Sequence, residues 1–141
     1  MTPFPELYDE HRQLEAQAER LREIVMGRMP DAAAVAGMRW KMAQAIHNHC
    51  AHEDMAIYQA IFASGDGAAT RAAWADRKDH GQLPRAFGKY VKDWPVTRIN
   101  REWEAFRAET LAMLERLGSR IANEEQVLYP HAERVRVRRA A

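Results

Sequence analysis

The residues best suited to chemistry in this sequence lie in the stretch 46–58, IHNHCAHEDMAIY. His49 and Glu53 are four residues apart, so on a helix they lie on the same face. Apolar residues recur at spacings of three and four on both sides of the pair, which places it on the face that packs against a core. A buried carboxylate without a partner is unstable because it loses its hydration. The pair therefore needs a partner, and a metal ion that accepts imidazole and carboxylate ligands would provide one.

Four helices are expected to position these residues. Helical periodicity and helix-breaking residues predict helices over about 4–26, 31–63, 68–92 and 97–130. We expect a kink in the third helix after His80, because Pro84 cannot donate a hydrogen bond to the carbonyl of His80. Long amphipathic helices joined by short loops favour an all-α fold, an up-down-up-down four-helix bundle.

Length and composition limit the classes of function. The 141 residues fit a single domain, expected over 1–134, and the basic tail 135–141 is expected to be disordered. Lys and Arg number 21 against 20 Asp and Glu, so no net charge indicates a nucleic-acid or membrane partner. A single cysteine fits a reducing compartment, and there is no apolar run long enough to span a bilayer. We therefore expect a cytoplasmic protein.

The two halves of the chain resemble each other. DEHRQL around His11 matches KDHGQL around His80, and HCAHEDMAIY at 49–58 matches RIANEEQVLY at 120–129. The second match places Glu53 over Glu124. The repeat predicts two helical hairpins related by a pseudo-twofold axis, each sending a histidine and a carboxylate into one core. Helical bundles build two-metal sites in this way.

These motifs resemble the hemerythrin-like, or HHE cation-binding, family from about Leu7 to Pro130, including the ending NEEQVLYP at 123–130. The resemblance implies a four-helix bundle with a non-haem di-iron centre in which the two glutamates are bridging carboxylates. Zinc or manganese would also suit such a donor set. The ligands implied by the resemblance are His11, His49, Glu53, His80 and Glu124.

Arg120 departs from the family pattern, because it stands where the second repeat should have a histidine. Its guanidinium stays protonated and cannot donate a lone pair to a metal. Three arrangements are open: two metals with water or His131 as a substitute ligand, one metal with Arg120 in the second position, or no metal. Repulsion between Arg120 and a second cation, about 4 kcal/mol for unit charges at 4 Å and an effective dielectric constant of 20, favours the single metal.

The resemblance implies a binding protein more than a dedicated enzyme. The first hypothesis is a small non-haem iron protein that binds or senses oxygen, nitric oxide or iron. The second is a redox enzyme, such as a peroxidase or ferroxidase, that uses the same centre. The third is a metal-free helical interaction module whose site has decayed. A homodimer is also left open as a partner.

Overall fold

The computed structural model describes residues 4–140, and all regular structure within them is helical. Two of the segments, η1 and η2, are single π-helical turns between α-helices. The elements in chain order are α1 (Pro5–Val25), α2 (Ala32–Glu53), η1 (Asp54–Tyr58), α3 (Gln59–Ser64), α4 (Gly67–His80), α5 (Gln82–Asp93), α6 (Val96–Arg101), α7 (Trp103–Asn123), η2 (Glu124–Leu128) and α8 (Tyr129–Ala140).

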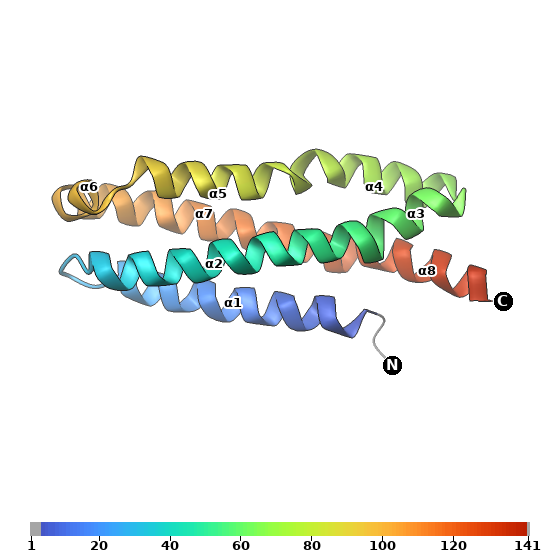
Figure 1. The fold of residues 1–141 in the computed structure, drawn as a ribbon, viewed down its shortest axis with the longest axis horizontal. Coiled ribbons are helices and arrows are strands. Elements are labelled where there is room, and N and C mark those ends of the chain that lie inside the picture. Colours follow the sequence, from blue (N-terminus) through green and yellow to red (C-terminus); the bar gives the residue numbers. More distant parts are fainter. Residues whose placement is uncertain (1–3, 141) are drawn as a thin grey trace.

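The helices form a bundle whose long members run along a common axis (Figure 1). The α2, η1 and α3 segments follow one another without a gap, as do α7, η2 and α8. Helix α1 packs against α2 and α7, α2 packs against α5, and α4 packs against α8 and η2. No helix of residues 4–140 is both long and apolar enough to cross a membrane.

The predicted helix ends are partly confirmed. The Asp31 carboxylate caps α2 by accepting a hydrogen bond from the amide of Ala34, as the sequence indicated. The expected kink after His80 is a break at Gly81 between α4 and α5. The helix predicted from about residue 97 begins as the short helix α6, which follows the extended residue Pro95.

The fourth helix is expected to end or kink at Pro130. The expected ending is wrong, because α8 continues the helix to Ala140. Proline breaks a helix by removing a hydrogen bond to the carbonyl four residues earlier. The preceding turn, η2, is π-helical, so its hydrogen bonds already span five residues and the helix can continue. Residues 135–140, expected as an irregular tail, continue α8, whereas Ala141 lies outside the described residues.

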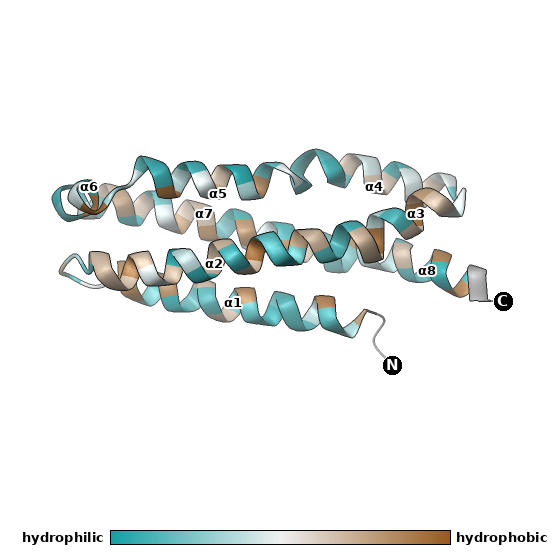
Figure 2. Ribbon diagram, viewed as in Figure 1, coloured by the Kyte–Doolittle hydropathy of each residue, from teal (hydrophilic) through white to brown (hydrophobic). Residues whose placement is uncertain are grey.

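The core consists of two apolar clusters on either side of a buried polar layer. One cluster, toward α6, includes Leu14, Ile46 and Ile121. The other, toward α3 and α8, includes Leu7 and Leu128. Figure 2 shows apolar (brown) and polar (teal) residues interspersed along the helices. The polar layer between the clusters contains most of the buried ionisable residues: His11, His49, Glu53, Asp76, His80, Arg120 and Glu124.

Candidate metal centre

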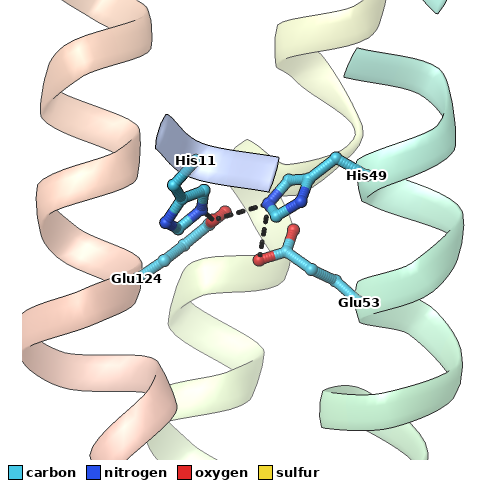
Figure 3. A group of neighbouring side chains, drawn as sticks. All are labelled: His11, His49, Glu53 and Glu124. Atoms are coloured by element: carbon cyan, nitrogen blue, oxygen red, sulfur yellow. Dashed lines mark hydrogen bonds and ion pairs between the residues drawn. The ribbon is translucent and has the colours of Figure 1, made fainter. Parts of the chain in front are cut away.

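Four buried side chains of the polar layer converge on one point. One ligand atom from each of His11, His49, Glu53 and Glu124 lies within 4.8 Å of the others. The imidazole Nε2 of His11 is 2.7 Å from Glu124 Oε1, and Nε2 of His49 is 3.3 Å from the same oxygen. The side chains point toward one another, with His49 and Glu53 on one helix and His11 and Glu124 on other segments (Figure 3). The structure thus brings together four of the five residues expected as ligands.

The fold places these donors through three different segments of the chain. His11 comes from α1, while His49 and Glu53 end α2 one turn apart. Glu124 is the first residue of the π-helical turn η2. The other π-helical turn, η1, begins directly after Glu53. Both π turns therefore lie in the two stretches whose sequences resemble each other, and such turns are frequent at functional sites.

The two carboxylates of this group have pKa values that are shifted in opposite directions. Burial, followed by the charge of Glu124, raises the pKa of Glu53 to about 8. Burial alone would also raise the pKa of Glu124, but hydrogen bonds from His11 and His49 and the Arg120 charge hold it well below its usual value. Two carboxylates packed together in this way call for a positive charge between them.

His49 provides part of that charge when it is protonated. Burial opposes its protonation, but hydrogen bonds to Glu124 and Glu53 raise its pKa to about 10. A proton on His49 Nε2 and a metal ion would occupy the same lone pair, so they exclude each other. The arrangement therefore accepts either a proton or a cation at the same place.

Tyr129 also contacts this group. Its hydroxyl donates a hydrogen bond to Glu53 Oε2 at 2.7 Å and lies 3.2 Å from His11 Nε2. Its ring stacks on the His11 ring with a centroid distance of 5.3 Å. The burial of the hydroxyl beside Glu53 and Glu124 raises the pKa of Tyr129, which keeps it a hydrogen-bond donor.

Two acidic residues outside the group, which the sequence analysis did not single out, contact its histidines. Glu125 Oε2 is 2.6 Å from Nδ1 of His11, and Glu10 Oε1 is 2.6 Å from Nδ1 of His49. The second oxygen of Glu10 lies 2.7 Å from Nδ1 of His52. The sequence signal was available, because Glu10 precedes His11 and Glu125 follows Glu124.

His80, the fifth expected ligand, lies apart from the four. Its Nδ1 is 3.5 Å from Glu53 Oε1 and 3.0 Å from Nη2 of Arg120, while Nε2 is 3.0 Å from Asp54 Oδ1. Burial and the neighbouring guanidinium lower the pKa of His80, so its ring is neutral near pH 7. It can accept a hydrogen bond from Arg120 through Nδ1.

Arg120 is buried and bonded on every side. Its Nε lies 2.7 Å from Glu124 Oε2, and its two terminal nitrogens hold both oxygens of Asp76 at 2.8 and 3.0 Å. Nη2 also donates to the hydroxyl of Tyr58 at 3.3 Å, and that hydroxyl donates to Asp76. These carboxylates raise the pKa of Arg120 although burial opposes it, so it is a permanent cation.

Asp76 is the main residue that the sequence analysis missed. It lies four residues before His80, on the same face of α4. In the first half, the residue four positions before His11 is Leu7. That spacing was a signal, because a carboxylate on a buried helical face is uncommon unless it is paired. Asp76 accepts a further hydrogen bond from the side chain of Asn123 at 2.8 Å.

His131, expected as a substitute ligand, does not reach either group of ligand atoms that the described residues form. The second of these groups contains Cys50, Glu53 and His80. Burial followed by the Glu53 charge raises the pKa of the Cys50 thiol to about 12. Beside this second group lies the Arg120 guanidinium, with Nη2 3.0 Å from Nδ1 of His80.

The donor set fits a metal ion. Imidazole and carboxylate are the ligands of non-haem iron, manganese and zinc. Oε1 of Glu53 is among the buried polar atoms of residues 4–140 that lack a hydrogen-bond partner, and its side chain is 1% exposed. Such an atom is costly to leave unpaired, and a cation bound between the two glutamates would remove that cost.

Comparison with known proteins agrees with this chemistry. The family described as the hemerythrin HHE cation binding domain matches residues 2–132, nearly the whole chain. No curated protein and no solved structure matches the chain significantly. The buried histidines and glutamates could hold a cation of the kind that the family is described as binding. The chain therefore belongs to the hemerythrin HHE cation-binding domain family.

Proposed function

We propose that this protein binds one non-haem iron ion through His11, His49, Glu53 and Glu124 and uses it to bind a small ligand such as dioxygen or nitric oxide. In this proposal Arg120 replaces a histidine ligand of the second position, and the fold is an up-down-up-down four-helix bundle built from a repeated hairpin. Bound iron would supply an open coordination position for the small ligand. The protein supplies the donors and the apolar surroundings that limit access of water.

The observation that carries the proposal is the difference between the two oxygens of Glu124. Oε1 faces His11 and His49, whereas Oε2 is held 2.7 Å from the Arg120 guanidinium. One side of this carboxylate is thus available to a cation, and the other already has one. The single-metal arrangement follows, since a second ion beside Arg120 would be repelled.

The metal-free alternative has less support. If the site had decayed, Arg120 would be expected to neutralise both glutamates. It contacts Glu124 but pairs its two terminal nitrogens with Asp76, and it leaves Glu53 Oε1 without a hydrogen-bond partner. Glu53 is therefore free to act as a ligand.

Metal content of the purified protein tests the proposal. After loading with ferrous iron under anaerobic conditions and desalting, elemental analysis should give one iron per chain. Nitric oxide added to this protein should change its electron paramagnetic resonance spectrum, because a ligand has entered an open position. Two tightly held irons per chain, or no retained iron, would contradict the proposal. Rapid turnover of peroxide, or catalytic oxidation of ferrous iron, would favour the redox enzyme instead.

A further inference from the structure

We propose that Glu10 and Glu125 are positioning residues, which fix the rings of His49 and His11 so that both Nε2 atoms face the metal position. The inference rests on the proposed function, because it assigns roles toward the same ion. Each carboxylate lies 2.6 Å from the Nδ1 of its histidine, on the side away from the centre.

The ring nitrogens explain why this contact matters. A neutral imidazole carries its proton on one nitrogen and offers the lone pair of the other. With the Nδ1 proton donated to a carboxylate, Nε2 keeps its lone pair and points to the ion. The carboxylate also makes the ring a stronger donor, and the loss of such a partner typically weakens metal binding about 10–100-fold.

The positions of the two acids in the chain connect the ligands to one another. Glu10 is the neighbour of His11 on α1 but holds His49 of α2. Glu125 is the neighbour of Glu124 on η2 but holds His11 of α1. Both α1 and η2 therefore supply one group toward the centre and one that orients a histidine of another segment. The orientation of the donors thus depends on how the helices pack.

Outer contacts hold the acids in place. The Glu10 oxygen that does not contact His49 pairs with His52, which is partly exposed. Arg12 pairs with the Glu125 oxygen that also contacts His11. Both acids keep partial access to solvent, with side-chain exposures of 30% for Glu10 and 21% for Glu125. A substitution at either position can therefore be accommodated without opening a cavity in the core.

The other half of the chain provides a control for these roles. Asp54, which matches Glu125 in the repeat, lies 3.0 Å from His80 Nε2. Asp79, which matches Glu10, pairs with Arg116 at 3.2 Å and lies 3.9 Å from Arg120 Nη1. The outer carboxylates are present in both halves. Only in the first half do both contact histidines of the four-residue group, so only there should they influence a metal.

Titration with Co²⁺ tests the roles, because bound Co²⁺ has an absorption spectrum that reports ligand geometry. The dissociation constant and spectrum are compared for the full chain and for Glu10→Ala, Glu10→Gln, Glu125→Ala and Glu125→Gln. The alanine variants should bind about 10–100-fold more weakly, with an altered spectrum. The glutamine variants should recover part of the loss, because an amide oxygen still accepts the Nδ1 proton. Asp54→Asn is the matched control and should bind like the unchanged chain.

The outcomes separate this inference from the proposed function. Absence of Co²⁺ binding by the unchanged chain would overturn both. Normal Co²⁺ binding with unchanged affinity and spectrum in both alanine variants would overturn the positioning roles alone. Thermal unfolding of the metal-free variants tests for a merely structural effect. Metal affinity should increase from the alanine variant to the glutamine variant to the unchanged chain, whereas the melting temperature should not follow this order.

Discussion

The two halves of the polar layer contain similar residue types around the same pair of glutamates but neutralise them differently. In the first half, His11 and His49 present nitrogen atoms that can bind a proton or a metal. In the second, Arg120 supplies a fixed positive charge, and Asp76 supplies a negative charge beside it. The positive charge beside the glutamates can therefore be gained or lost in the first half, whereas it is fixed in the second.

The Asp76 carboxylate determines what Arg120 does to the rest of the site. At the matching place in the first half the residue is Leu7, which is buried and apolar. If residue 76 were a leucine, Glu124 would be the nearest carboxylate left to Arg120, and the guanidinium would neutralise negative charge that a metal needs. Because Asp76 balances Arg120 with two hydrogen bonds, Glu124 can retain its charge toward the two histidines. The buried Arg120–Asp76 pair thus distinguishes the second half from the first, where His49 and Leu7 stand at the matching places.

The largest expected effect is on stability, at Asp76. Asp76→Asn removes one charge of a buried pair in which both side chains are at most 5% exposed. Breaking such a pair should lower the free energy of unfolding by about 3–5 kcal/mol, because the partner stays buried with less compensation. Urea unfolding of the metal-free protein measures this change. Asp79→Asn is the matched control and should cost at most about 1 kcal/mol, since that carboxylate is half exposed. Equal losses for the two variants would show that Asp76 contributes no more to stability than Asp79 does.

Metal affinity should distinguish the histidines of the two halves. His49→Ala removes a donor of the four-residue group and should weaken iron binding by about a hundredfold or more, beyond the effect of losing an outer partner. His80→Ala should change the affinity little, because Arg120 already occupies the hydrogen-bond acceptor Nδ1. Competition with a chelator of known affinity measures both. Equal losses would mean that the metal lies between the halves and that His80 is a ligand.

Local spacing predicted the main helices, and the repeat together with the family resemblance named the four residues that converge. His49 and Glu53 are one turn apart, and the repeat placed Glu124 and His11 opposite them. The sequence could not place Asp76 or Glu10, because their partners lie on other helices and depend on packing. It also could not predict that the helix continues past Pro130, since a π-helical turn before the proline is rare and has no signal in local spacing.

Restoring the residue pair of the first half should produce a second metal position. The double variant Arg120→His with Asp76→Leu replaces the fixed cation by a lone pair and removes its counter-charge. The metal content should rise from one to two irons per chain, with His80, the new histidine and the two glutamates as donors. Arg120→His alone is the informative comparison, because it leaves Asp76 buried without its cation. An unchanged single iron in both variants would contradict the idea that the halves are repeats.

The smallest effect concerns pH, and it again contrasts the halves. Burial opposes protonation of His49, but hydrogen bonds to Glu124 and Glu53 raise its pKa from 6.5 to about 10. Protonated His49 therefore stabilises the metal-free fold fully below pH 6.5, and this contribution is lost as the pH rises toward 10. Burial and the Arg120 charge lower the pKa of His80, so its contribution is present above pH 6.5 and is lost at lower pH. Melting temperatures are measured against pH in the presence of a chelator. His49→Gln should make the fall in melting temperature between pH 7 and 10 less steep. His80→Gln should make the fall below pH 6.5 less steep. Glu53, with its pKa near 8, adds to the first slope and limits how flat it becomes. If both variants changed the melting temperature over the same pH range, the two histidines would share one electrostatic environment. Arg120 would then not make the two halves electrostatically different.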